Sequence, residues 1–143
     1  MTELPKPRAE TTEQFLAQSG PELAALCTAC GACFDVCPMV DHVDLRGADP
    51  RAVTEGLRSL AKGENAAEQT VSWVGACTRS GLCVSACPQR EAGLDAMLLI
   101  RIAKQHAINE THQLASKYDQ GLFPRVKVFA RLQLSDEELE NWL

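Results

Sequence analysis

One pattern of cysteines occurs twice in this chain, and it constrains the fold more than any other feature. The first copy, Cys27 to Pro38, reads CTACGACFDVCP, and the second copy, Cys77 to Pro88, reads CTRSGLCVSACP. When the two copies are aligned, every cysteine and the closing proline coincide, except that Ser80 stands opposite Cys30. All seven cysteines of the 143-residue chain belong to these two motifs. The motifs must therefore carry whatever thiol chemistry the chain has.

The spacing of the first motif is typical of a cubane iron–sulfur site. Three cysteines, each separated from the next by two residues, can wrap one cluster, and a fourth cysteine follows directly before a proline. Small residues are needed where the backbone approaches inorganic sulfur, and Ala29, Gly31 and Ala32 provide them. Pro38 has a fixed φ and no N–H, so it turns the chain away after the last cysteine. This pattern indicates iron–sulfur chemistry.

Structural zinc and disulfides are the alternatives for a cysteine-rich chain. Zinc sites pair Cys-x2-Cys knuckles across a longer spacer and close with four ligands each, and seven cysteines cannot fill two such sites. An odd cysteine count argues against a disulfide scaffold, and the polar start MTELPKPRAE has no signal-peptide core. We therefore expect iron–sulfur clusters in a reducing compartment, and a cytoplasmic protein.

Ligand sets follow from the two copies together. In two-cluster proteins the cysteine before proline reaches across to the other cluster. The crossed arrangement gives the first cluster four thiolates: Cys27, Cys30, Cys33 and Cys87. It leaves three thiolates for the second cluster: Cys37, Cys77 and Cys83.

The second site raises the question of what Ser80 does. A site with three thiolates can hold a 3Fe–4S cluster, which lacks one iron corner. It can also hold a full 4Fe–4S cube whose last iron takes the Ser80 oxygen, water or a group from a partner. Iron prefers soft thiolate, and a serine hydroxyl must lose a high-pKa proton to bind, which favours the missing corner. Ser80 as a small residue that only fits the loop is a further alternative.

Composition excludes several function classes. The chain has 14 basic and 19 acidic residues, a net charge of −5 and no run of Lys or Arg, which argues against nucleic-acid binding. No apolar run is long enough to span a bilayer. The three histidines, His42, His106 and His112, have no acid–base partners around them, and no Gly-rich phosphate loop is present. We expect no catalytic residue.

Helix signals dominate the rest of the chain and predict an all-α fold. A Thr11–Gln14 capping box opens a short helix that stops near Gly20, and a new helix starts at Pro21. Helices are also expected from Asp49-Pro50 to Gly63, through Ala66 to Trp73, over roughly residues 94–115, and after Ser135. Residues 120–134 fit either a strand or a helix. Two cluster-binding loops are thus expected among short helices.

These motifs, with a helical insert between them, resemble the helical ferredoxin fold. The chain is similar to the two-cluster iron–sulfur subunit of heterodisulfide reductase and its bacterial relatives, and to the cluster-binding C-terminal half of the succinate dehydrogenase iron–sulfur subunit. In the latter family a Cys-x5-Cys-x3-Cys-Pro motif holds a 3Fe–4S cluster, and the resemblance lends that role to Cys37, Cys77 and Cys83. The heterodisulfide reductase subunit usually has a second motif with all four cysteines, so Ser80 departs from the pattern of that family.

The resemblance implies three parts and a function. Residues 1–19 would be an N-terminal extension with a short helix, and residues 20–115 the dicluster domain. Residues 116–143 would be a tail whose aromatic and charged residues suit docking to a partner, with packing on its own domain as the alternative. The expected function is non-catalytic electron transfer within a heterodisulfide-reductase-like oxidoreductase complex, with a larger cysteine-rich catalytic subunit and a flavoprotein as partners. Alternatives are a quinone-linked dehydrogenase, which would place the protein at the membrane periphery, and a cluster-based redox sensor.

Overall fold

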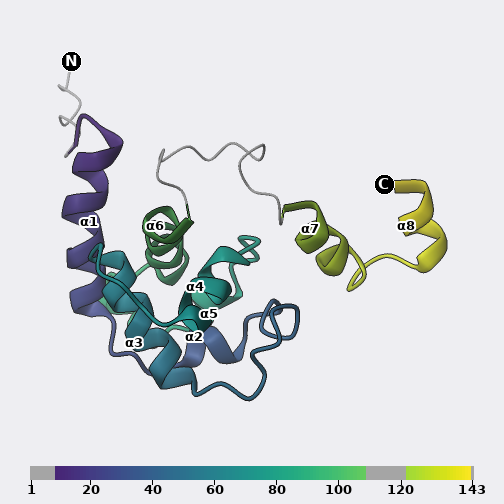
Figure 1. The fold of residues 1–143 in the computed structure, drawn as a ribbon, viewed down its shortest axis with the longest axis horizontal. Helices are drawn as coiled ribbons and strands as arrows, with labels where there is room; N and C mark the ends of the chain where they lie inside the picture. The colour runs from purple at the N-terminus through teal and green to yellow at the C-terminus, as the bar shows by residue number, and fades with distance from the viewer. Residues whose placement is uncertain (1–8, 109–121, 143) are drawn as a thin grey trace.

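A computed structural model describes residues 9–108 and 122–142 of the chain (Figure 1). Every regular element within these two stretches is a helix and no strand occurs in them, which confirms the all-α prediction. The elements in chain order are α1 (Thr12–Leu26), α2 (Ala32–Asp35), α3 (Pro50–Ala61), α4 (Glu68–Gly75), α5 (Leu82–Ala86), the 3-10 helix η1 (Arg90–Ala92), α6 (Ala96–Ile108), α7 (Leu122–Ala130) and α8 (Asp136–Trp142). Within the described stretches, no helix has the length and apolar character needed to cross a bilayer.

Helix α1 begins where the sequence predicts but does not stop at Gly20. The Thr11 hydroxyl accepts the N–H of Gln14 at 3.2 Å, which confirms the N-cap. The helix then continues through Gly20 and Pro21 to Leu26, so the predicted break was wrong. Gly20 is buried against α3, and a Cβ there would lie 2.0 Å from the carbonyl oxygen of Ala61. The glycine therefore serves the close approach of two helices and does not end α1.

The insert between the two cysteine motifs forms α3 and α4, as predicted. The Asp49 side chain caps α3 by accepting the N–H of Arg51 at 3.0 Å, and Pro50 occupies the first turn. Gly63, at φ 81°, follows the end of α3 and donates its N–H to the Leu60 carbonyl at 2.9 Å. Helix α4 carries Trp73 and ends just before Cys77. The insert is thus two packed helices that lie beside the motifs.

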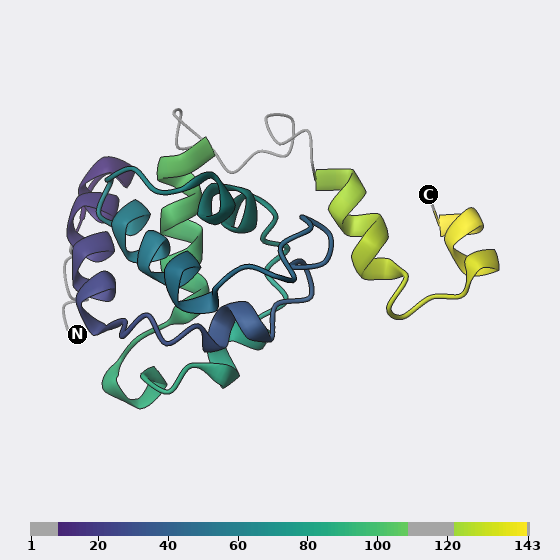
Figure 2. The same ribbon diagram turned by 60° about the horizontal axis from the view of Figure 1, so that its bottom comes forward.

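Helix α6 is the centre of the bundle. It packs against α1, α3, α4 and α5 (Figures 1 and 2). The apolar stripe expected on this helix includes Leu94, Ile102 and Ala103, which are buried, while Met97 and Leu98 are half-buried. The part of the predicted helix beyond residue 108 lies outside the described residues. Helix α6 thus joins the core to both cysteine motifs.

The two cysteine motifs each contain a short helix, and these helices pack on one another. Helix α2 belongs to the first motif and α5 to the second, and they lie side by side in both ribbon views (Figures 1 and 2). Helix α2 also contacts α3, and α5 contacts α6. Packing α2 on α5 brings the two motifs together although residues 39–76 separate them in sequence.

The tail is helical where the sequence was ambiguous. Residues 122–130 form α7, which settles the strand-or-helix question for that stretch. The predicted capping box before α8 is confirmed, because Ser135 donates its N–H to Glu138 at 2.8 Å and its hydroxyl accepts the N–H of Glu138 at 3.3 Å. The proposed division of the chain at residues 19 and 115 stays a prediction.

Candidate metal centres

The two cysteine loops share one backbone conformation. In the first loop Ala29 has φ 53° and Gly31 has φ 86°, and in the second loop Arg79 has φ 63° and Gly81 has φ 79°. Each loop therefore uses two left-handed residues at the same two positions, and the glycine then caps a short helix. Because the backbone is repeated, Ser80 stands at the place in the second loop that Cys30 holds in the first.

The helices before and after each loop place the remaining cysteines. Cys27 caps the C-terminus of α1, donating its N–H to the Leu23 and Ala24 carbonyls, and its Sγ accepts the N–H of Ala29 at 3.4 Å. In the second motif Cys77 follows Ala76, the C-cap of α4, and donates its N–H to the Val74 carbonyl at 3.2 Å. The thiols are thus held by helix ends and by the helices packed around them.

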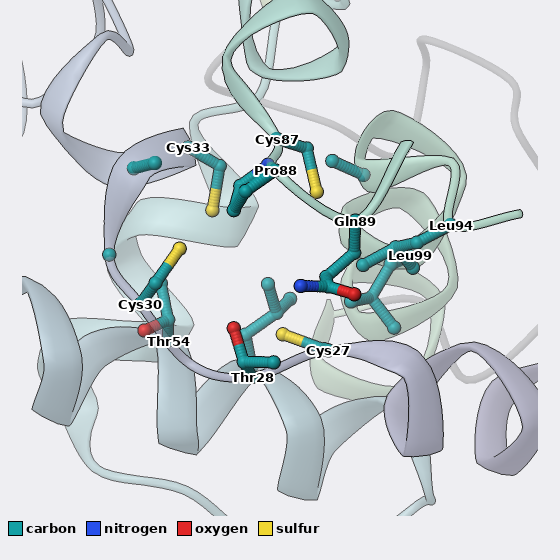
Figure 3. Close-up of a pocket in the computed structure, with 14 residues that line it drawn as sticks. Cys27, Thr28, Cys30, Cys33, Thr54, Cys87, Pro88, Gln89, Leu94 and Leu99 are labelled. Carbon is teal, nitrogen blue, oxygen red and sulfur yellow. The ribbon is translucent and has the colours of Figure 1, made fainter. Parts of the chain in front are cut away.

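Four cysteines from both motifs surround one pocket. The sulfur atoms of Cys27, Cys30, Cys33 and Cys87 point into the same space (Figure 3). Three of them come from the first motif and Cys87 comes from the second, at the C-terminal end of α5. The structure therefore brings together the four residues that the crossed arrangement predicts for the first cluster.

The wall of this first pocket is apolar and comes from helices outside the motifs. Thr54 and Leu57 of α3, and Leu99 of α6, line it and are buried. The Thr54 hydroxyl already has a partner within its own helix, since it donates to the Pro50 carbonyl at 2.9 Å. The sequence predicts a helical apolar position for Leu57 but assigns none of these three residues to a pocket, because their helical spacing is the same as that of any core residue.

The other three cysteines surround a second pocket. Cys37, Cys77 and Cys83 line it together with Ser80 and Arg79. Cys33 lines this pocket as well as the first, so the two sites adjoin. The structure therefore also brings together the three thiols that were left for the second cluster, with Ser80 among them.

Trp73 forms part of the wall of the second pocket. It is 2% exposed, and its ring meets that of Phe34 edge-to-face with centroids 5.4 Å apart. Met97 and Ile100 of α6 complete the wall, while Ala96 and Leu99 of the same helix face the first pocket. Helix α6 therefore separates both sites from the rest of the core and closes them to water on that side.

The donor set fits iron–sulfur clusters. Four cysteines line each pocket, and Cys33 is common to both. In the part of the chain that the structure describes, no three His, Cys, Asp or Glu side chains are arranged to hold a single metal ion. The thiols surround a volume, as a polynuclear cluster requires, and do not converge on a point, as zinc ligands do.

Burial keeps several of these thiols protonated when no metal is bound. Desolvation raises the pKa of Cys33 to about 12 and that of Cys83 to about 11, and neighbouring cysteines add to both shifts. Burial also raises the pKa of Cys27 and of Cys37, and hydrogen bonds partly offset it in both cases. Metal binding to these residues must therefore displace protons.

We expect the cluster-free protein to lose stability above about pH 9. A thiol whose pKa is higher in the folded state keeps a proton that the unfolded chain has released, so the free energy of unfolding falls as pH rises. For Cys33 and Cys83 this window runs from about pH 9 to about 11 or 12. Urea unfolding at pH 8 and pH 10 should show a lower midpoint at pH 10.

The control for this prediction is a double variant, Cys33→Ser with Cys83→Ser. It should lose less stability than the parent chain between the two pH values, because lysines and tyrosine titrate equally in both proteins. An equal loss in the two proteins would show that neither thiol is desolvated by folding.

Neither of the two histidines that the structure describes lines a cysteine pocket. His42 is exposed, His106 lies on α6, and neither lines a cysteine pocket. His112 lies outside the described residues. Among the described residues the two pockets are lined by seven cysteines, and Ser80 lines the second pocket at the position that Cys30 has in the first loop.

A comparison with protein-family models identifies the fold and its chemistry. The model described as a 4Fe-4S dicluster domain matches residues 23–94, which is 72 of the chain's 143 residues and includes both motifs. The chain belongs to the 4Fe-4S dicluster domain family. It is an iron–sulfur, ferredoxin-like protein with a role in electron transfer. No curated protein and no solved structure matches the chain.

The family narrows the alternatives for the thiols. A dicluster domain accounts for two cysteine pockets in one small helical bundle, and it favours iron–sulfur clusters over structural zinc. The matched segment begins in α1 and ends just before α6, so it takes in the insert and both loops. The matched family carries 4Fe–4S clusters, whereas this chain has only seven cysteines for two of them.

Proposed function

We propose that this protein is an electron-transfer subunit that holds a 4Fe–4S cluster and a second, three-thiolate cluster in series. Cys27, Cys30, Cys33 and Cys87 would bind the first cluster, and Cys37, Cys77 and Cys83 the second. The clusters supply the capacity to accept and donate single electrons. The helices hold the thiols, exclude water on the α6 side and keep the two sites adjoining.

The crossed arrangement of the cysteines carries this proposal. Each pocket takes cysteines from both motifs, and Cys33 borders both pockets. Two redox groups held this way would be neighbours, so an electron could pass between them without leaving the protein. The described residues show no acid–base pair at either pocket, which suits a relay better than a catalyst.

For the second site we propose a 3Fe–4S cluster whose missing corner faces Ser80. The hydroxyl stands at the position of a fourth thiolate, but it is a harder and less acidic ligand for iron. Ser80 is exposed, so its hydroxyl can remain hydrated instead of binding metal. A 4Fe–4S cluster with an oxygen ligand is the alternative.

Ser80→Cys is expected to convert the second site into a full cubane site. The added thiolate would stand where Cys30 stands in the first loop, so iron should rise from about seven to about eight ions per chain. The oxidised-state EPR signal of a 3Fe–4S cluster should disappear. Anaerobic iron analysis and EPR of the oxidised protein would measure both changes.

Ser85→Cys is the matched control, because Ser85 is an exposed residue of α5 that lines neither pocket. It should leave iron content and spectrum unchanged. If Ser80→Cys also left both unchanged, the loop would be unable to close on a fourth iron and the proposed vacant corner would be wrong.

We further propose that the relay serves a heterodisulfide-reductase-like oxidoreductase complex, with a cysteine-rich catalytic subunit and a flavoprotein as partners. The resemblance of the two motifs to those of the heterodisulfide reductase iron–sulfur protein supports this. A quinone-linked dehydrogenase at the membrane periphery is an alternative within the same class. A redox sensor is the alternative outside it.

Anaerobic affinity purification from the native host tests the assignment to a complex. We expect a larger protein to co-purify and its electron donor to reduce both clusters, one electron each. Reversible bleaching of the clusters, with no co-purifying protein and no electron passed on, would favour the sensor.

A further inference from the structure

The two cysteine loops have the same backbone conformation but differ in which residues cover them. In the first loop, Gly31 is buried under the start of α3, and a Cβ on it would lie 2.5 Å from the Cβ of Pro50. At the equivalent position of the second loop, a Cβ on Gly81 would meet nothing within 4 Å. Helix α3 therefore seals the first loop, and no element in the described residues seals the second.

The second loop also exposes the side chains around that glycine. We call residues 79–82 the open loop. Arg79 and Ser80 are exposed, and Leu82 is 50% exposed although it is a large apolar residue directly before Cys83. Its counterpart in the first loop is the small residue Ala32. The open loop thus presents a cation and an apolar side chain at the edge of the second pocket.

Arg79 is the feature that indicates a partner. The loop requires a left-handed residue there, and an arginine at φ 63° is less favourable than glycine would be. The first loop meets the same requirement with Ala29, so the backbone does not call for a long side chain. In the described part of the chain Arg79 has no carboxylate within ion-pair distance. Arg58, near the first pocket, is instead bonded to Glu55 and to the Ala24 carbonyl.

We propose that the open loop is the docking face through which the second cluster exchanges electrons with a protein partner, and that this partner is acidic there. Carboxylates on the partner would pair with Arg79, and an apolar contact would cover Leu82. The partner would thereby seal the second loop as α3 seals the first. This inference rests on the proposed function, since it requires a cluster behind the loop.

Two protein electron acceptors of opposite charge test the proposal without the native partner. Acidic plastocyanin takes one electron as its copper(II) becomes copper(I), and basic cytochrome c takes one as its iron(III) becomes iron(II). The reduced, cluster-loaded chain loses one electron in either reaction. Arg79→Glu should slow the reaction with plastocyanin and speed the reaction with cytochrome c, each by about two- to five-fold at low ionic strength. Stopped-flow absorbance measures both rates.

Arg90→Glu is the matched control. Arg90 is exposed and follows Gln89, which lines the first pocket, so this variant makes the same change in net charge on the side of the first site. It should change each rate by less than Arg79→Glu does. A larger effect of Arg90→Glu would place electron exchange at the first cluster, and equal effects would show that only net charge matters. Either result would overturn the proposal.

A spectroscopic readout separates this inference from the proposed function. Chromium(III) tris-oxalate is a paramagnetic anion, and near Arg79 it should enhance the spin relaxation of the second cluster in EPR power saturation. Arg79→Glu should weaken that effect, and Arg90→Glu should not. If wild-type protein holds no second cluster, the proposed function fails. If both clusters load normally and Arg79→Glu changes neither rates nor relaxation, the docking face alone is wrong.

Discussion

Replacing Cys30 with alanine is expected to abolish the four-iron cluster of the first site and to leave the second cluster in place. Cys30 is one of four sulfurs that point into the first pocket, and it does not line the second. A cubane that loses a corner thiolate loses its hold on that iron, and the first site would then keep three thiolates, as the second site has, so iron should fall from about seven to about six ions per chain. Because Cys30 is exposed, the substitution removes little core packing.

Ser80→Ala is the control for this experiment, because it truncates the equivalent residue of the second loop. It should leave the first cluster and its reduced-state EPR signal intact. Unchanged iron and spectra in Cys30→Ala would show that Cys30 is not a ligand, and the assignment of the first site would be wrong.

The second large effect is expected from Gly31→Ala. The substitution places a Cβ at φ 86° and within 3.1 Å of the Pro50 backbone, so it adds steric overlap to an unfavourable conformation. Left-handed strain costs about 1–2 kcal/mol and overpacking about 1–3 kcal/mol, so we expect a loss of about 2–5 kcal/mol in the free energy of unfolding. The first cluster should also be lost more readily on heating.

Gly81→Ala is the matched control, because Gly81 has nearly the same backbone conformation as Gly31 but an added Cβ there overlaps with no other atom. Its φ is 79° and its Cβ would meet nothing within 4 Å, so only the strain of about 1–2 kcal/mol should appear. Anaerobic thermal unfolding of the two variants, followed by circular dichroism and by cluster absorbance, measures the difference. Equal destabilisation would mean that α3 does not seal the first loop.

The residues that meet in each pocket could be predicted because the cysteine spacing carries the chemistry. Seven cysteines in two aligned motifs leave few ways to share ligands, and the structure brings the predicted sets together around two pockets. The cysteine spacing does not predict which helices line the pockets. Thr54, Met97 and Ile100 have the periodicity of ordinary core residues, and only the packing of α3 and α6 gives them this place.

One prediction along the chain was wrong and another had stayed open, and both show what local patterns leave out. Gly20-Pro21 is a typical signal for a helix end, yet α1 continues because its packing on Ala61 requires a residue with no side chain. The alternating pattern of residues 126–134 also fits a strand, but residues up to 130 form α7. Local propensity could not weigh the contact between α1 and Ala61, and periodicity alone does not distinguish a short helix from a strand. The difference in cover between Gly31 and Gly81 was likewise invisible in two nearly identical motifs.

Iron analysis and EPR of the anaerobically purified, oxidised protein test the central claim most directly. Four thiols around one pocket and three around the other predict about seven iron ions per chain and an oxidised-state signal typical of a 3Fe–4S cluster. The signal must persist without oxygen, because damaged cubanes can lose iron and imitate it. About eight irons and a silent oxidised state would mean two cubanes, with Ser80 or a partner holding the last iron. About four irons or fewer, or zinc in place of iron, would contradict the account of two clusters in series.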